Sequence, residues 1–409
     1  MKRDSRALEA ALGELDRQRL RRRRTTIDRF PEPGNRTTVV VNGRQLLDFC
    51  SNDYLGLARH PQVAAAMANA ASELGSGSGA SHLVTGHGRE HALLEEELAA
   101  FTQRESALLF STGYMANLAV IGALANRGES VVLDRLSHAS LIDACVLSGA
   151  RFRRFTHNNV ASAERMLEES GATVSVIATE GVFSMDGDVA PLPALAALSA
   201  AHQAWFVVDD AHGLGVLGAT GRGSVEQAAL SERDVPVLVG TLGKSFGTFG
   251  AFVAGPADLI DFLVQKARTY IYTTALPQPV AAATRRSLQI IQEEGWRRDR
   301  VLALTARFRA GAEALGVPLS DSNTPIQPVI LGSADAALTA QQSLADAGFW
   351  VTAIRPPTVP SGSARLRVTL SAAHTNSQVD QLVEVLSRVL DKDLAVTSAI
   401  AGDLAAVSH

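Results

Sequence analysis

The chain has 409 residues, of which 46% are hydrophobic and 20% are charged, and its formal net charge at pH 7 is −4. This composition is ordinary for a globular enzyme of two or three domains, and the small negative charge argues against general binding to nucleic acid. No apolar run reaches the roughly 18 residues of a membrane span, no signal peptide opens the chain, and two cysteines give no disulfide framework. We therefore expect a soluble cytoplasmic protein.

The first 20 residues carry leucines at helical spacing, at Leu8, Leu12 and Leu15, and predict a peripheral amphipathic helix. Four arginines then occupy positions 21 to 24. Such a run is usually a solvated face, but a guanidinium group also offers a bidentate fork to a carboxylate or a phosphate. The residues alone leave both interpretations open.

The next segments contain turn and helix signals. Asn42-Gly43, between apolar runs at 39–41 and 46–49, predicts a β-hairpin, and Pro61 predicts the first position of a helix. The glycine-rich loop at 75–79 follows no strand and misses the spacing G-x-G-x-x-G. We therefore do not interpret this loop as a dinucleotide-binding loop.

Three histidines, His82, His87 and His91, follow that loop closely. The last two, with Glu90 between them, match H-x-x-E-H, an inverted zinc motif. The motif needs a stable helix across its length, and Gly88 lies between the two histidines. We therefore expect His87 and His91 near the start of a helix, without a metal ion.

Two strand ends in the first half of the chain predict parts of a ligand site. Residues 106–110 predict a strand, and small, hydroxylic residues over 111–117 lead from it into a helix. Free backbone N–H groups at a helix N-terminus suit a phosphate, although capping alone also explains Ser111 and Thr112. His138 follows the next strand, as either an ordinary loop histidine or a ring that stacks on a planar cofactor.

Two predicted buried strands in the middle of the chain are followed closely by charged side chains. The apolar run 205–208 ends in Asp209 and Asp210, and the run 235–241 is followed by Lys244. In open α/β sheets, ligands bind in the crevice beyond the carboxyl ends of the strands. An acid and a lysine there suit pyridoxal phosphate (PLP), because the lysine forms the Schiff base and the acid pairs with the pyridinium nitrogen.

Other interpretations of these residues remain. Asp209 could cap a turn, and Lys244 could be a surface lysine. Gly243-Lys-Ser245 resembles the end of a Walker A loop, but that motif needs glycine at position 238, which is leucine. The same segment matches the nucleophile elbow G-x-S-x-G, yet only His374 and His409 follow it, and no HGGG-type oxyanion segment is present.

Strand–helix alternation over roughly 105–255 predicts an α/β fold whose central sheet is mostly parallel and has helices on both faces. A helical region follows from Gln278 to about residue 315, and strands near 329–331, 351–354 and 365–370 surround a helix at 337–347. The expected parts are an N-terminal helix and hairpin segment at 1–53, a large cofactor-binding domain at 54–292, a small α+β domain at 293–395 and a mobile tail at 396–409.

Four motifs carry a resemblance to a known family: Asn52-Asp-Tyr-Leu-Gly-Leu, Glu180-Gly-Val-Phe-Ser-Met-Asp-Gly-Asp, Asp209-Asp-Ala-His-Gly and Gly243-Lys-Ser-Phe-Gly. Through them the chain resembles the α-oxoamine synthases, PLP-dependent transferases of fold type I, from about residue 21 to about residue 390. The segment Arg355-Pro-Pro-Thr358 resembles the branch that serves biotin biosynthesis.

This resemblance implies roles for residues at matching positions. Lys244 holds PLP, Asp209 pairs with the pyridine N–H group, and His138 stacks on the ring. Further cofactor contacts are implied for Gly113, Tyr114, Ser184, His212 and Thr241. Substrate contacts are implied for Arg21, Asn52, Arg355 and Thr358, and the position within the arginine run stays open. No metal ion is implied.

The implied reaction is the decarboxylative condensation of L-alanine with a pimeloyl thioester of coenzyme A or a carrier protein. In it, the Lys244 amine removes the Cα proton of alanine. The alternative is the reaction of a sister α-oxoamine synthase, such as a glycine C-acetyltransferase. The resemblance also implies a homodimer with the active site at the interface, where Tyr272 to Thr274 reach the neighbouring subunit.

Overall fold

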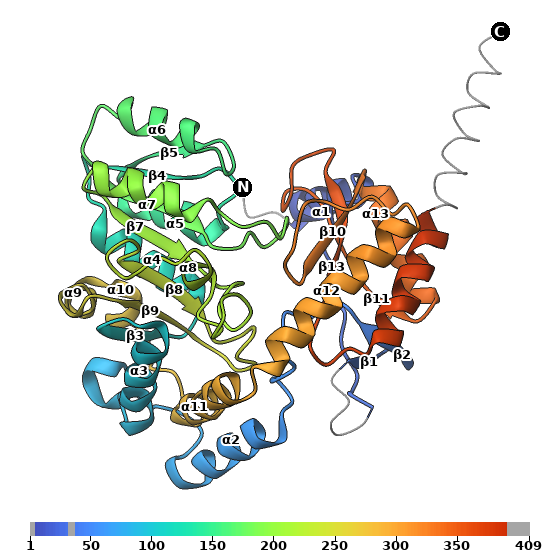
Figure 1. Ribbon diagram of the computed structural model, residues 1–409, viewed down its shortest axis with the longest axis horizontal. Coiled ribbons are helices and arrows are strands. Elements are labelled where there is room, and N and C mark those ends of the chain that lie inside the picture. The colour runs from blue at the N-terminus through green and yellow to red at the C-terminus, as the bar shows by residue number, and fades with distance from the viewer. Residues whose placement is uncertain (1–4, 32–36, 391–409) are drawn as a thin grey trace. The chain divides into compact units, whose positions relative to one another are not determined.

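A computed structural model of the chain describes residues 5–31 and 37–390 (Figure 1). It divides into two compact units. The large unit comprises Asp53–Ser184 and Asp188–Arg300, and the small unit comprises Met1–Asn52, Met185–Gly187 and Val301–His409. The N-terminal segment therefore belongs to the same unit as the C-terminal part of the chain. The tail expected at 396–409 lies outside the described residues.

The large unit is built on a seven-stranded sheet with the order β3-β9-β8-β7-β6-β4-β5. The strands from β8 to β5 run parallel, whereas β9 runs antiparallel to both of its neighbours, β3 and β8. The expectation of a mostly parallel sheet is confirmed. The strands are β3 (Ser106–Phe110), β4 (Ser130–Asp134), β5 (Arg151–Phe155), β6 (Val174–Glu180), β7 (Trp205–Asp209), β8 (Val237–Thr241) and β9 (Ala251–Gly255).

Apolar side chains on alternate positions of these strands fill two separate cores, one on each face of the sheet. In β7, Val207 packs into one core, whereas Phe206 and Val208 pack into the other. Helices cover both faces of β7, and its sequence is therefore a continuous apolar run. Helices α4, α5, α9 and α10 contribute to the first core, and α6, α7 and α8 to the second.

The helices of the large unit connect the strands and cover the sheet (Figure 1). They are α2 (Pro61–Leu74), the π-helix η1 (His82–Gly86), α3 (Arg89–Thr102), α4 (Gly113–Leu124), α5 (Ala139–Ser148), α6 (Val160–Glu168), α7 (Leu192–Ala201), α8 (Ser224–Gln227), α9 (Ala257–Lys266), α10 (Arg268–Ile271), α11 (Gln278–Glu293) and the start of α12 (Trp296–Ala314). The helix expected from Pro61 is confirmed. The helical region after Gln278 is two helices, α11 and α12.

The small unit contains two three-stranded sheets, with the orders β1-β2-β11 and β10-β13-β12. The hairpin expected around Asn42-Gly43 joins β1 to β2, and both turn residues have the positive φ that such a turn requires. The elements are α1 (Ser5–Arg17), β1 (Thr38–Val41), β2 (Arg44–Asp48), β10 (Ile326–Gly332), α13 (Ala334–Asp346), β11 (Phe349–Trp350), β12 (Thr352–Ile354) and β13 (Ala364–Thr369). Residues 376–390 are also helical.

A search of the described residues for a helix long and apolar enough to cross a bilayer finds none.

Candidate active site

Lys244 lies three residues beyond the carboxyl end of β8, in the turn that follows Thr241. Its Nζ atom is 2.7 Å from Nε2 of His212, and Nδ1 of His212 is 2.6 Å from the hydroxyl of Tyr54. A protonated lysine can only donate, so Nε2 of His212 accepts and Nδ1 donates its proton to the Tyr54 oxygen. This relay fixes the direction of the lysine amine.

Asp209 is the last residue of β7, the strand next to β8, and its side chain is almost fully buried. Its Oδ2 atom accepts a hydrogen bond from the Asn117 amide at 2.7 Å. The same amide donates to the Ser140 hydroxyl at 2.9 Å, and that hydroxyl lies 2.7 Å from Nδ1 of His138. A continuous network therefore connects the carboxylate of Asp209 with the ring of His138.

Two further buried carboxyl groups flank Asp209. Glu180 is its register partner on β6, and Asp210 is its neighbour along the chain. Burial, followed by the charge of Asp209, raises the pKa of Glu180 to about 8. Burial also raises the pKa of Asp210 to about 7. Burial therefore opposes ionisation of both carboxyl groups next to Asp209.

The carboxyl group of Asp210 is enclosed by glycines from two loops, Gly181 after β6 and Gly213 and Gly223 between β7 and α8. A Cβ atom on Gly181 or Gly213 would lie 2.2 Å from Oδ1 of Asp210, and one on Gly223 would lie 1.9 Å from Oδ2. The Ser224 backbone N–H group donates to Oδ2 at 2.7 Å. Asp210 thus joins the loop after β6 to its own loop, and only glycine at these positions leaves room for its carboxyl group.

His138 and Tyr114 lie close together at the ends of neighbouring elements. His138 is the N-cap of α5, and its ring accepts a hydrogen bond from the Ser140 backbone N–H group at 3.2 Å. The ring of Tyr114 meets it edge to face, with 6.4 Å between ring centroids, and the Tyr114 hydroxyl donates to Asp143. Both rings are exposed, so a planar cofactor could reach them.

The start of α4 presents free backbone N–H groups near these rings. Thr112 is the N-cap and accepts from the Met115 backbone N–H group at 3.2 Å. A Cβ atom on Gly113 would meet no heavy atom within 4 Å, so the approach to the helix N-terminus is open. Such a terminus attracts phosphate groups. Thr241, at the end of β8, donates its hydroxyl to Gly250 at 3.2 Å.

Ser184 follows β6 in a loop that a charged histidine holds in place. Each ring nitrogen of His157 contacts a carboxylate, Asp134 at 3.0 Å and Asp188 at 2.7 Å. Burial alone lowers the pKa of His157, but the hydrogen bonds and charges of the two carboxylates outweigh burial and raise that pKa to about 10. Phe183, which precedes Ser184, packs its ring against the imidazole at 4.4 Å between centroids.

We expect His157→Gln to lower the free energy of unfolding by about 2–4 kcal/mol near neutral pH. The pKa of His157 is higher in the folded state than the unfolded value of 6.5. Its stabilisation is therefore complete below about pH 6.5 and is lost as the pH rises through about 10. Denaturant unfolding at several pH values should show the difference between the wild type and the variant narrowing toward pH 10.

His202→Gln, at the exposed C-terminal end of α7, is the matched control for this prediction and should change stability little. If the difference in free energy of unfolding between His157→Gln and the wild type stayed constant with pH, His157 would contribute to stability through packing alone.

The four residues expected to contact substrate all belong to the small unit. Arg367 donates to the Asn52 amide oxygen at 3.0 Å, and Arg355 donates to the backbone carbonyl of Arg19. Arg22 donates to the Thr358 hydroxyl at 2.9 Å. Burial, followed by the charge of Arg22, lowers the pKa of Arg355. Within the arginine run it is thus Arg22 that lies with Thr358 and Arg355.

Arg21 lies elsewhere in the small unit. It forms an ion pair with Asp16 of α1 at 2.6 Å. A cavity of about 330 Å³ is lined by Arg22, Arg23, Arg355 and Thr358 together with Trp350, but not by Arg21. In the part of the chain that the structure describes, the arginine expected at the substrate is therefore paired with an acid outside this cavity.

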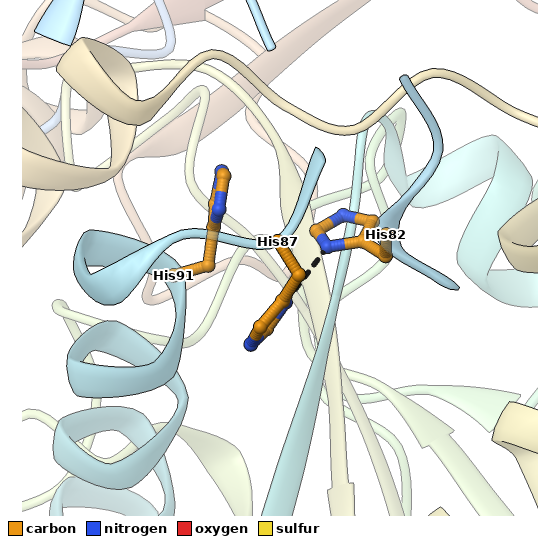
Figure 2. Close-up of side chains that lie close together, drawn as sticks. All are labelled: His82, His87 and His91. Atoms are coloured by element: carbon orange, nitrogen blue, oxygen red, sulfur yellow. Dashed lines mark hydrogen bonds between the residues drawn. The ribbon is translucent and has the colours of Figure 1, made fainter. Parts of the chain in front are cut away.

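The three histidines of the H-x-x-E-H region come together at the start of α3 (Figure 2). His82 and His87 are joined by a hydrogen bond of 3.0 Å between their Nδ1 atoms. His91 accepts from the Gly88 backbone N–H group through Nδ1, and its Nε2 contacts the Leu276 carbonyl. A metal ion bound by all three rings would have to displace these hydrogen bonds. As expected, His87 and His91 flank the first turn of a helix.

The side chains and backbone groups of the large unit suit the binding of PLP. Asp209 is a buried carboxylate that forms no ion pair with any of the residues described by the structure, and a pyridinium N–H group would supply the missing positive charge. The Lys244 amine, the exposed His138 ring and the open N-terminus of α4 belong to the same unit. They offer, in turn, a nucleophile, a stacking face and a phosphate site.

Several residues of this arrangement were not predicted from the sequence. Asn117, Ser140 and Tyr54 connect the expected residues, and Glu180 stands beside Asp209. Asn117 offered one signal, because a polar residue in the first turn of an otherwise apolar helix is unusual in a buried position. Tyr54 gave none, since its partner His212 is distant in the chain, and Ser140 gave none for its bond with Asn117, 23 residues away.

The chain is similar to proteins of known family over most of its length. The family model for class I and II aminotransferases matches residues 44–386. The 8-amino-7-oxononanoate synthase of Thioalkalivibrio sulfidiphilus is 61% identical over 85% of this chain and 89% of the relative. That of Cellvibrio japonicus is 56% identical over 94% of this chain and 96% of the relative.

Solved structures agree with this assignment. Serine palmitoyltransferase of Sphingomonas wittichii is 35% identical and superposes with a TM-score of 0.88 over 94% of this chain and 96% of its own. The 8-amino-7-oxononanoate synthase of Francisella tularensis is 32% identical, with a TM-score of 0.75 over 85% of this chain and 99% of its own. Both comparisons support a fold-type I PLP transferase. The chain belongs to the class I and II aminotransferase family of PLP-dependent enzymes and, within that family, to the 8-amino-7-oxononanoate synthases.

Proposed function

We propose that the protein condenses L-alanine with a pimeloyl thioester and releases CO2, the thiol carrier and 8-amino-7-oxononanoate, a step of biotin biosynthesis. The observation that carries the proposal is the pair of neighbouring strand ends that present Lys244 beside His212 and the buried carboxylate of Asp209. The curated relatives that share 56–61% identity with the chain bear this enzyme's name.

PLP, when bound, withdraws electrons from the Cα atom of the amino acid attached to it. Lys244 supplies the base: its amine takes the Cα proton of alanine and later returns a proton to the product. His212 holds the Nζ atom of Lys244 at 2.7 Å, and Tyr54 fixes the tautomer of that histidine. The relay keeps the amine aimed while the proton is transferred.

Asp209 stabilises positive charge on the ring nitrogen, and its neighbours strengthen this role. An ion pair at about 4 Å contributes on the order of 4 kcal/mol at an effective dielectric constant near 20. Burial raises the pKa of Glu180 to about 8 and that of Asp210 to about 7, so both neighbours carry less negative charge near neutral pH than exposed carboxyl groups would. The Asn117 amide, which donates to Oδ2 of Asp209 at 2.7 Å, would hold the orientation of this carboxylate.

The small unit supplies the groups for the substrates in this proposal. Arg355 binds the carboxylate of alanine, and Thr358 and Asn52 line the substrate site. The cavity of about 330 Å³ beside Arg355 has cationic walls and an indole ring, which suits an acyl chain with an acidic end. We assign the contact with the acyl donor to Arg22, because Arg22 lines this cavity and Arg21 does not.

Arg22→Ala should raise the KM for the pimeloyl donor about 10-fold or more, the loss expected when a charged hydrogen bond to the substrate is removed. Arg21→Ala is the matched control, and its KM should stay within about 3-fold of the wild type because Arg21 pairs with Asp16. Steady-state kinetics at saturating alanine measures both. If Arg21→Ala raised this KM more than Arg22→Ala did, the contact with the acyl donor would be assigned to Arg21, as the resemblance implies.

A grid of two amino acids and three acyl donors tests the function. We expect L-alanine to be preferred over glycine, and pimeloyl thioester over acetyl-CoA and succinyl-CoA. The free thiol and the released CO2 are measured with PLP-loaded protein. A preference for glycine with acetyl-CoA would instead assign the protein to the glycine C-acetyltransferases, the sister activity that stays the alternative.

The proposal includes a homodimer in the cytoplasm. Leu83, Val84 and Tyr272 expose large side chains, with Val84 73% and Tyr272 71% accessible. Their segments are linked by the bridge between Ser81 and Thr274, so the exposed groups belong to one continuous surface. In a homodimer, a second copy of the chain would cover this surface and bury its apolar side chains. Sedimentation velocity of the PLP-loaded protein tests the dimer, and a monomer at micromolar concentration would contradict it.

A further inference from the structure

Among the residues that the structure describes, a buried arginine near the start of β3 has no side-chain partner. Arg104 lies between α3 and β3, and only 8% of its surface is accessible. Its Nε atom is buried without a hydrogen bond, and its guanidinium group forms no hydrogen bond or ion pair with any residue over 5–31 and 37–390. Burial lowers the pKa of Arg104, and the charges of Glu232 and Asp234 only partly offset this effect. A guanidinium group in this state favours an anion.

The acids around Arg104 are engaged elsewhere. Glu226 forms an ion pair with Arg222 at 2.8 Å and also accepts from Thr220. Asp234 accepts from the Ser231 hydroxyl at 2.7 Å. Glu232 accepts from the Glu105 backbone N–H group at 3.3 Å. These carboxylates attract Arg104 from a distance, but none lies within the 4.0 Å of an ion pair in the described part of the chain.

Arg104 lines a cavity of about 240 Å³ together with Gln103, Arg222, Glu226, Ser231, Glu232 and Leu238. The Nε atoms of Arg104 and Arg222 are both buried, so a ligand in the cavity would meet the Arg104 guanidinium group through its Nη atoms. Arg222 is already paired with Glu226, which leaves Arg104 as the guanidinium group of this lining that forms no ion pair within the described residues. The volume of the cavity is below the roughly 300–1,000 Å³ of sites for drug-sized ligands, so it would admit only a small molecule.

This cavity is distinct from the candidate active site. Strands β3 and β8 are both antiparallel to β9, so they run parallel to one another and begin at the same edge. Arg104 precedes β3 and Leu238 lies near the start of β8, whereas Lys244 follows the end of β8. The length of β8, roughly 13 Å, thus separates the cavity from the catalytic lysine.

We propose that this cavity binds a small oxyanion, a carboxylate or a phosphate, through the guanidinium groups of Arg104 and Arg222. A planar guanidinium fork matches two oxygens of such an anion, and the anion would supply the hydrogen bonds and the charge that Arg104 lacks. Arg222 keeps its ion pair with Glu226 through Nη2, so the anion would pair chiefly with Arg104. The site does not depend on the reaction that the enzyme catalyses.

Calorimetry of the full, PLP-loaded chain tests the proposal with sodium phosphate and sodium acetate as probes, at constant ionic strength set by chloride. The wild type should show a saturable rise in Tm with at least one probe, since a ligand of the folded state alone stabilises it. Arg104→Met should weaken that binding about 10-fold or more. Arg127→Met, an exposed arginine after α4, removes the same charge and should leave the response intact.

A second measurement separates an anion site from an internal ion pair. Without oxyanions, Arg104→Met should keep the Tm of the wild type or exceed it, because methionine removes an unmatched buried charge and retains an apolar stem. A lower Tm would show that Arg104 pairs with Glu232 within the folded chain and would overturn the proposal. The proposal would also be overturned if phosphate and acetate raised the Tm of Arg104→Met as much as that of the wild type. It would be overturned equally if neither probe raised the Tm of the wild type.

Discussion

Replacement of Lys244 by alanine is expected to abolish turnover while the fold is retained. Lys244 is the only residue that we assign both to attachment of PLP and to transfer of the Cα proton. A positioned acid–base group contributes roughly 10²–10⁴-fold by itself, and loss of the covalent attachment adds to this. PLP should still bind, because Asp209, His138 and the N-terminus of α4 remain in place.

The chain makes the test of Lys244 simple, since its four lysines are Lys2, Lys244, Lys266 and Lys392. Borohydride reduction followed by peptide mapping should place the pyridoxyl label on Lys244 in the wild type. Lys266→Ala, at the C-terminal end of α9, is the matched control and should keep both the label and the activity. A label on any other lysine would refute the assignment.

Asp209→Asn should retain PLP and lose about 10³-fold in kcat, because an amide cannot balance a positive ring nitrogen. This estimate corresponds to about 4 kcal/mol for an ion pair at 4 Å and an effective dielectric constant near 20. The amide is close in size to the carboxylate, so the hydrogen bond with Asn117 is the main contact that has to rearrange.

Asp210→Asn is the control for the Asp209 prediction. Asp210 is buried with a raised pKa, and its oxygen accepts from the Ser224 backbone N–H group, a contact that an amide oxygen can also make. Its activity should stay within about 10-fold of the wild type. Single-turnover kinetics on both variants decides between them, since near wild-type rates in Asp209→Asn would assign the ring nitrogen to Asp210 or to no carboxylate.

The sequence predicted those parts of the fold and the site that follow from local patterns. The apolar runs before Asp209 and Lys244 are strands β7 and β8, and they are neighbours in the sheet. The strand at 151–155 was not predicted, because its sequence Arg-Phe-Arg-Arg-Phe is neither an apolar run nor a regular alternation, as an edge strand allows. Strand β9 at 251–255 was also missed, since no helix separates it from β8.

Contacts between distant parts of the chain could not be predicted in the same way. Asn117 and Asp209 are 92 residues apart, and their hydrogen bond depends on the direction of each side chain after the sheet has formed. The arginine run shows the same limit, since adjacent arginines point in different directions. Arg21 pairs with Asp16, and Arg22 reaches Thr358. Spacing alone does not determine such directions.

The glycines around Asp210 have a consequence for how this protein can vary. Aspartate is the shortest side chain that carries a carboxyl group, so no smaller acid makes room for a methyl group on Gly181, Gly213 or Gly223. A single change at any of these positions forces the loop or the acid to move. The loop after β6 and the loop between β7 and α8 are therefore constrained together, although they are separate in the chain. A tolerated substitution at one of these glycines therefore requires a second substitution that shortens the side chain of residue 210.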